Sequence, residues 1–212
     1  MWTIRLSIIF LLYALIGLFA FFLRNRARYG RILENRILNV FSVILYNLCC
    51  YLPVALPPAH GSLFELSLVA YSGVNVGFRV FGCALIGLGA LLGIATLRRR
   101  RAVGGQDTAD GLITSGPYQY CRHPIYAGIV LVSLGLPLLA LNPDGLLIFP
   151  LVLLANTIEA KIEETHDIGV RFKLQYEQYK KTTRMLGPVW FWAGLVLTLL
   201  ILAGLPLLCG PI

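Results

Sequence analysis

The stretch SGPYQYCRHPIYAG, residues 115–128, places an arginine and a histidine directly before an apolar segment. Gly116-Pro117 indicates a turn, and Pro124 suits the first turn of a helix, where its missing N–H needs no partner. Arg122 and His123 are therefore expected at a helix N-terminus, where free N–H groups and the helix dipole favour an anion. Arg122 would add a bidentate clamp for a carboxylate. The structural alternative is that Arg122 reaches to lipid headgroups and His123 caps the helix.

A second polar group, Glu159, Glu163 and Glu164, follows a later apolar segment. Glu159, Glu163 and then His166-Asp167 share one stripe of a continuing helix, and this stripe could face Arg122. Acidic groups near a membrane boundary are costly unless a cation accompanies them. Arg122 is one candidate partner and a cationic ligand is another. The alternative for each glutamate is a place on a solvated helical face.

Three glycines, Gly87, Gly89 and Gly93, lie in one apolar stretch. Glycines in membrane helices usually allow two helices to pack closely. The same lack of side chains would let a flat ligand lie against the backbone. The sequence leaves both interpretations open.

Aromatic residues and one cysteine complete the candidates for chemistry. Phe172, Tyr176 and Tyr179 are spaced by four and three, which places them on one face of a helix, and Lys180-Lys181 follow. This pattern predicts an amphipathic helix at a membrane interface. Cys121 differs from the other cysteines because Arg122 could lower its pKa, but no partners for acyl transfer accompany it.

The composition is that of an integral membrane protein. The hydrophobic share is 58%, the charged share 13% and the mean hydropathy +0.76. We predict an all-α fold of about six transmembrane segments, the fourth and fifth forming a hairpin turned by Asn142-Pro143-Asp144, with the fifth unusually short. The predicted segments are Thr3–Leu23, Ile32–Leu52, Val76–Leu97, Pro124–Leu141, Gly145–Ile158 and Val189–Leu208. The apolar stretch Ser62–Tyr71 is short enough to be interfacial or buried.

Charge placement predicts the orientation. All of the 18 Lys and Arg residues except Arg5 and Arg79 fall in three connections on one side of the alternating segments. The opposite loops, Pro53–Asn75 and Asn142–Asp144, contain none. The basic connections are therefore expected to face the cytoplasm. A net charge of +8 distributed in this way suits anionic lipid headgroups better than nucleic acid.

The run GLITSGPYQYCRHPIYAG, the apolar hairpin, the paired acids and RFKLQYEQYKKTTRMLGP together resemble a known family. They resemble the isoprenylcysteine carboxyl methyltransferase and phospholipid methyltransferase superfamily of integral membrane enzymes over roughly Leu112–Pro188. The resemblance implies S-adenosylmethionine as methyl donor, bound in a cytoplasmic pocket without a Rossmann domain. Gly104-Gly105 lacks the strand that a Rossmann loop would follow.

The resemblance also implies which residues line the cofactor site. They are Tyr118, Arg122, His123, Pro124, Tyr126 and Gly128, the paired acids Glu163 and Glu164, and, by likeness to the phospholipid branch, Gly87 and Gly89. Arg122, His123, Glu163 and Glu164 are the candidate catalytic residues, and no metal site is predicted. The chain departs from the family pattern where His166-Asp167 and Gly169 intervene and where Lys173, instead of glycine, follows Phe172.

The predicted function is methyl transfer to a lipid-soluble acceptor, either an isoprenylcysteine-type carboxylate or a phospholipid-type amine. The alternatives are an NADPH-dependent membrane sterol or steroid reductase and a non-enzymatic transporter or assembly protein. The predicted partners are the bilayer and a lipid or lipidated substrate, in the plasma membrane or endoplasmic reticulum; the oligomeric state stays open. We divide the chain into an N-terminal hairpin with its loop (1–75), a methyltransferase core (76–188) and a C-terminal transmembrane helix (189–212).

Overall fold

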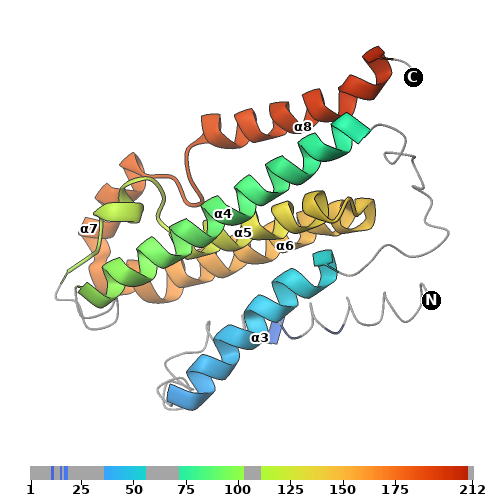
Figure 1. Cartoon of the computed structure of the whole chain (residues 1–212). Helices are drawn as coiled ribbons and strands as arrows, with labels where there is room; N and C mark the ends of the chain where they lie inside the picture. Colours follow the sequence, from blue (N-terminus) through green and yellow to red (C-terminus); the bar gives the residue numbers. More distant parts are fainter. Residues whose placement is uncertain are drawn as a thin grey trace.

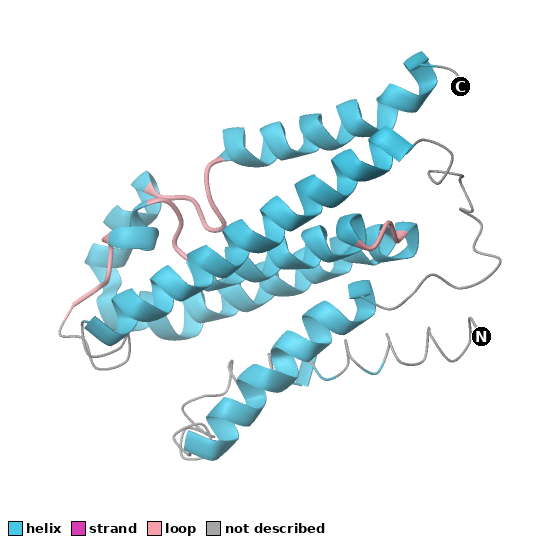
Figure 2. Ribbon diagram, viewed as in Figure 1, coloured by secondary structure: helices cyan, strands magenta, loops and turns pink. Residues whose placement is uncertain are grey.

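The computed structural model describes residues 36–55, 72–102 and 111–209, together with Leu11, Leu15, Gly17 and Leu18. Every regular element in these ranges is helical, and no strand occurs among them (Figure 2). The all-α prediction is thus confirmed for the described part. The elements are α3 (Arg36–Ala55), α4 (Ser72–Ala102), η2 (Gly116–Gln119), α5 (Pro124–Leu139), α6 (Pro143–Glu163), the π turn η3 (Glu164–Ile168), α7 (Gly169–Thr182) and α8 (Val189–Cys209).

The helix α5 runs antiparallel to α4, and α6 runs antiparallel to α5 (Figure 1). The helix α8 lies along α4. The last turns of α4 and α6 and the first turns of α5 and α8 therefore lie at one end of the bundle, beside α7. We call this region, residues 98–102, 115–123 and 159–188, the polar end. It brings together both of the long polar connections that the sequence predicts on one side.

One described helix, Gly73–Ala102, is long and apolar enough to cross a membrane, with 30 residues and a mean hydropathy of 2.3. Pro124–Leu139 and Val189–Leu202 are shorter apolar helices. The count of six spans stays a prediction. Most of the first predicted span lies outside the described residues, as do Ser62–Tyr71 and Gly104-Gly105.

The fifth predicted membrane segment, Gly145–Ile158, lies within α6, which has 21 residues because it begins at Pro143 and continues through Glu163. The predicted continuation of this helix past the apolar segment is confirmed as far as Glu163. At Glu159 the sequence becomes polar while the helix goes on, so the loss of hydropathy does not mark the helix end. The turn before α6 passes through Leu141, which has a positive φ of 51°, and α5 and α6 form the expected hairpin.

Close packing of α4 and α5 depends on two pairs of glycines, which we call the glycine seam: Gly82 with Gly135, and Gly89 with Gly128. A Cβ atom on Gly89 would lie 2.6 Å from the carbonyl oxygen of Gly128, and one on Gly135 would lie 2.6 Å from that of Gly82. Such distances exclude any side chain, so the backbones are nearly in contact. This packing fixes the first turn of α5 against α4 near the polar end.

Apolar side chains fill the remaining interfaces. One buried cluster joins α3 to α5 and α6, and another joins α4 and α5 to α8. The first contains Tyr46, Cys49, Cys50, Ile129, Val152 and Ala155; the second contains Phe78, Leu85, Leu131, Leu134, Leu138 and Leu195.

Candidate active site

The centre of the polar end is a buried ion pair between Arg122 and Glu164. The Arg122 Nε and Nη2 atoms each lie 2.8 Å from Glu164 Oε1, and both residues are less than a tenth exposed. Burial alone would raise the pKa of Glu164, but hydrogen bonds from His123, Tyr176 and Arg122 and the guanidinium charge lower it to about 2. Glu164 is therefore a carboxylate at neutral pH. Arg122 is one of the two partners that the sequence suggested for the acids.

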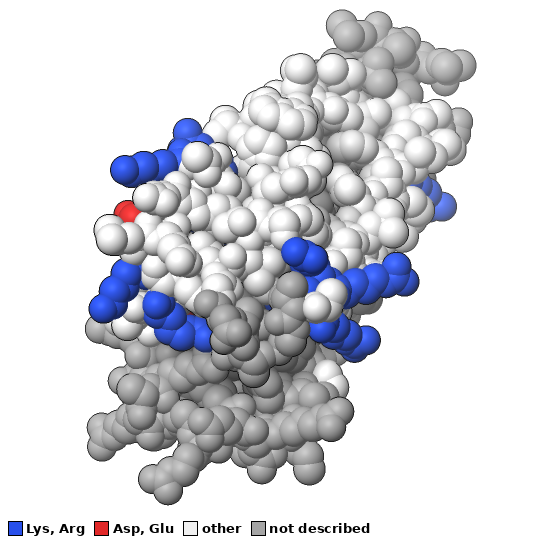
Figure 3. Space-filling model, turned by 90° about the vertical axis from the view of Figure 1, so that its left-hand side faces the viewer, with Lys and Arg blue, Asp and Glu red and all other residues white. Residues whose placement is uncertain are grey.

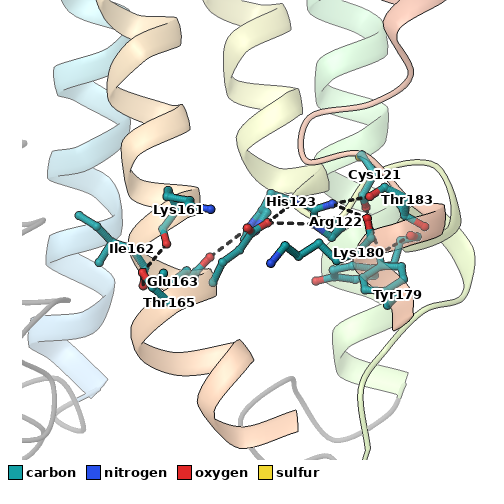
Figure 4. Close-up of polar contacts among 12 residues, drawn as sticks. Cys121, Arg122, His123, Lys161, Ile162, Glu163, Thr165, Tyr179, Lys180 and Thr183 are labelled. Atoms are coloured by element: carbon teal, nitrogen blue, oxygen red, sulfur yellow. Dashed lines mark hydrogen bonds and ion pairs between the residues drawn. The ribbon is translucent and has the colours of Figure 1, made fainter. Parts of the chain in front are cut away.

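His123 contacts both glutamates, and Figure 4 shows it beside Glu163 and Arg122. Its Nδ1 atom is 3.2 Å from Glu163 Oε2, and its Nε2 atom is 3.2 Å from Glu164 Oε1. Burial would lower the pKa of His123, but the hydrogen bonds and charges of both glutamates outweigh it and raise the pKa above 6.5. His123 is the N-cap residue of α5, as the structural alternative expected, but its side chain makes no capping hydrogen bond and contacts the glutamates instead.

The segment after α7 pairs with the residues before α5. The N–H of Arg122 donates to the carbonyl of Arg184 at 2.9 Å, and the N–H of His123 donates to that of Met185 at 3.0 Å. Arg122 Nη1 also donates to the carbonyls of Thr183 and Lys180. These two backbone N–H groups are therefore not open to an anion, and anion binding at the first turn of α5 stays a prediction.

Tyr118 links the segment before α5 to α4 and α7. Its hydroxyl accepts a hydrogen bond from Arg100 Nε at 2.8 Å, and its carbonyl accepts one from the hydroxyl of Tyr179. Tyr118 is 2% exposed. The sequence reasoning treated Arg100 only as a topology signal and missed this contact, because nothing in a run of four arginines shows which of them contact the loop before α5.

The aromatic face of α7 is confirmed. Tyr176 and Tyr179 are buried, and Phe172 packs with them and with Ile168 and Leu112. The hydroxyl of Tyr179 reaches the carbonyls of Tyr118 and, at 3.5 Å, Cys121. The aromatic face therefore anchors α7 to the loop that carries Arg122.

A π turn follows Glu163, where the chain departs from the family pattern. The N–H of Gly169 donates to the carbonyl of Glu164, five residues earlier, and a Cβ atom on Gly169 would lie 2.3 Å from that carbonyl oxygen. Only glycine fits there. π turns often occur at functional sites, and this one sets the direction of Glu164 relative to the turns of α6.

The second departure from the family pattern is a strained residue. Lys173 has φ 40° and ψ −111° within α7, a backbone conformation that glycine adopts far more readily than lysine. The chain therefore keeps a glycine-like kink after Phe172 without the glycine that the family pattern has there.

Other predicted residues lie as follows. Pro124 begins α5 and is buried; the ring of Tyr126 is 5.7 Å from that of His123. Gly89 and Gly128 form part of the glycine seam, whereas a Cβ atom on Gly87 would meet no atom within 4 Å. Gly89 thus has the packing role that the sequence left open, and Gly87 is the exposed member of the pair.

Burial raises the pKa of Cys121 to about 12, so Arg122 does not activate its thiol, in line with the lack of acyl-transfer partners in the sequence. The acidic stripe does not face Arg122 as a whole, because Asp167 pairs with Arg171 at 2.8 Å and His166 is exposed. Arg122 pairs with Glu164 instead, because the π turn after Glu163 changes which residues share one face of the helix.

The surface of the polar end is basic. Figure 3 shows this end face-on, with Lys and Arg side chains around an uncharged area and little acidic surface. Glu159 and Glu164 are hidden from it by burial. The exposed cations include Arg98, Arg101, Arg171, Lys173, Lys181 and Arg184.

Comparison with known families addresses the same region. Residues 78–168 match the family model described as phospholipid methyltransferase. The match confirms the resemblance to this methyltransferase superfamily. It extends from α4 to the π turn and so contains both pairs of site residues, Arg122-His123 and Glu163-Glu164. The phospholipid methyltransferase match indicates methyltransferase activity on a lipid-type substrate. No curated protein and no solved structure matches the chain.

Proposed function

We propose that the protein transfers a methyl group from S-adenosylmethionine to a lipid-soluble acceptor at the cytoplasmic face of a membrane. The observation that carries this proposal is the buried network of Arg122, His123, Glu163 and Glu164 inside the phospholipid methyltransferase match. The basic surface of the polar end supports a cytoplasmic orientation, because cytoplasmic loops carry the excess of Lys and Arg.

The acidic oxygens at the site fit the cationic end of this donor. Glu164 Oε2 is buried, and the Tyr176 side chain beside this carboxylate helps to keep its pKa low. The side chain of Glu163 is 26% exposed, and only its Oε2 atom contacts His123. Glu163 and Glu164 would therefore hold the donor's ammonium group, with Glu163 as the more accessible of the two.

Arg122 stabilises the arrangement of the site and contributes little to binding the donor directly. Its nitrogen atoms already contact Glu164 and the carbonyls of Thr183 and Lys180. Four contacts leave about one of the five guanidinium N–H groups for a donor carboxylate. The role of Arg122 is to keep Glu164 charged and in place.

When bound, S-adenosylmethionine supplies a sulfonium methyl group that is open to in-line displacement by a nucleophile. The protein's residues hold the reactants in line and exclude water, and positioning alone can contribute about 7–11 kcal/mol. A carboxylate acceptor needs no base, whereas an amine acceptor must lose a proton. His123 or a glutamate of the site is the candidate acceptor for that proton, and the two neighbouring carboxylates raise the pKa of His123.

Transfer of labelled methyl groups tests the function. Purified protein is incubated with S-adenosylmethionine labelled at the methyl group and with a membrane lipid extract, and label is counted in the organic phase. We expect label in lipid, reduced about tenfold or more by Glu163→Gln, which corresponds to about 1.4 kcal/mol. Glu177→Gln is the matched control, since Glu177 is exposed and pairs only with Lys180 in the described contacts. Folded wild-type protein that labels no lipid, or that oxidises NADPH instead, contradicts the proposal.

A further inference from the structure

A second arginine, Arg100, reaches the site from the last turn of α4. Its Nε atom donates a hydrogen bond to the Tyr118 hydroxyl at 2.8 Å, and Tyr118 is 2% exposed. Tyr118 belongs to η2, which packs against α4 at the polar end (Figure 1). Arg100 is half-buried, whereas the next residue, Arg101, is exposed. The guanidinium of Arg100 is therefore directed into the polar end, unlike that of its neighbour.

The surroundings of Arg100 place it near Glu163, the more accessible of the two acids of the site. The charges of Arg100 and Glu163 both act on the side chains of Tyr118 and Tyr126. The ring of Tyr126 is 5.7 Å from that of His123, and His123 Nδ1 lies 3.2 Å from Glu163 Oε2. One cationic and one anionic side chain thus have the same two tyrosine neighbours.

The hydrogen bond to Tyr118 orients Arg100 without cancelling its charge. Burial raises the pKa of Tyr118, although the charge of Arg100 opposes this, so the hydroxyl stays neutral at neutral pH. A guanidinium has five N–H donors in a planar fork, and the contact through Nε uses one of them. This fork matches the two oxygen atoms of a carboxylate.

The methyl donor brings such a carboxylate to the site. S-adenosylmethionine ends in an amino acid, which carries both an ammonium group and a carboxylate. Glu163 and Glu164 suit only the ammonium group. Arg122 already contacts Glu164 and two carbonyls, and the backbone N–H groups of Arg122 and His123 donate to the segment after α7. A second arginine beside Glu163 would complete the recognition of both charges of the amino acid.

We propose that Arg100 binds the carboxylate of the methyl donor, while Glu163 binds its ammonium group. This inference rests on the proposed methyltransferase function and adds a donor-binding residue to it. Arg100 and Glu163 belong to the last turns of α4 and α6, which lie at the same end of the bundle. Arg100 then contacts the donor directly, and Arg122 acts through Glu164.

Calorimetric titration with two ligands tests this inference. S-adenosylhomocysteine carries the carboxylate, whereas decarboxylated S-adenosylhomocysteine lacks it and keeps the ammonium group. We expect Arg100→Gln to weaken binding of the first about 10- to 100-fold and to leave that of the second within about threefold of wild type. Glu163→Gln should weaken both, because both carry the ammonium group. Arg101→Gln is the matched control from the same arginine run and should change neither affinity.

Arg100→Lys provides a second variant if Arg100→Gln does not fold. Lysine keeps the charge but not the fork, so S-adenosylhomocysteine should bind about threefold to tenfold more weakly, with the decarboxylated ligand unaffected. An equal loss for both ligands would show that Arg100 only holds Tyr118, and this result overturns the inference. Unchanged affinity for S-adenosylhomocysteine in a folded variant overturns it too, as does equal binding of the two ligands by wild type.

The same titration separates this inference from the proposed function. Where wild-type protein binds S-adenosylhomocysteine but Arg100 does not distinguish the two ligands, the methyltransferase proposal stands and the carboxylate site is elsewhere. Folded wild-type protein that binds neither ligand overturns both proposals.

Discussion

The polar end and the glycine seam hold α5 against its neighbours by opposite means. At the polar end, α5 is joined to α6 and α7 through the charged side chains of Arg122, His123 and Glu164. Along the seam, α4 and α5 touch through backbone atoms at Gly89 and Gly128, with no side chain between them. The seam therefore sets the spacing of the helices, while the polar end supplies groups that a ligand can replace or compete for.

The largest expected effect of a single change lies at the buried ion pair. Glu164→Gln leaves the charge of Arg122 buried without its counter-ion, so the free energy of unfolding should fall by about 3–5 kcal/mol. Glu163→Gln, on a half-buried side chain, should cost less than about 1 kcal/mol. Denaturation in detergent checks both variants. Equal costs for the two would show that Glu164 is not the central acid.

The dependence of stability on pH is an independent test of the Arg122–Glu164 ion pair. Because the pKa of Glu164 is about 2 in the folded protein against 4.5 ordinarily, its contribution is present above pH 4.5 and is lost as pH falls toward 2. The wild type should therefore lose stability over this range. Glu164→Gln should lack that part of the loss.

The seam should respond to a single methyl group. Gly89→Ala places a Cβ atom against a backbone oxygen that cannot move aside, and we expect a loss of about 1–3 kcal/mol in the same assay. Gly87→Ala, two residues earlier on α4, meets no atom and should be neutral or stabilising by up to about 1 kcal/mol. If Gly87→Ala weakens S-adenosylhomocysteine binding without a loss of stability, Gly87 lines the cofactor site as the resemblance implies. Equal stability of the two variants would contradict the close packing.

The smallest expected effect is a gain. Lys173→Gly should stabilise the protein by about 1 kcal/mol, because glycine adopts the positive φ of this kink without strain. Lys181→Gly, in the regular last turn of α7, should instead cost about 1 kcal/mol. Thermal unfolding of both variants measures the difference, and the absence of a gain at Lys173 would contradict the kink.

Local chemistry explains which features the sequence could predict. Pro124 marks the start of α5, Val189 the start of α8, and the opposite charges of Arg122 and the paired acids suggest their contact; all three are found. These predictions depend on residues whose preferences act over one helical turn.

The features that the sequence could not predict depend on direction in space. A uniformly apolar helix has no face that its pattern reveals, so the seam at Gly89 and the burial of Glu159 became visible only in the structure. The π turn that directs Glu164 toward Arg122 likewise follows from one glycine, Gly169, that the pattern shows only as an irregularity. The burial that raises the pKa of Cys121 comes from packing that its neighbour Arg122 does not indicate.

Calorimetric titration with S-adenosylhomocysteine tests most directly whether the polar end is a methyl-donor site. We predict saturable binding to wild-type protein in detergent, weakened about tenfold or more in Glu163→Gln and unchanged in Glu177→Gln. Binding that is equal in all three proteins would place the donor elsewhere. No binding to folded wild type, or binding of NADPH in its place, would contradict the account.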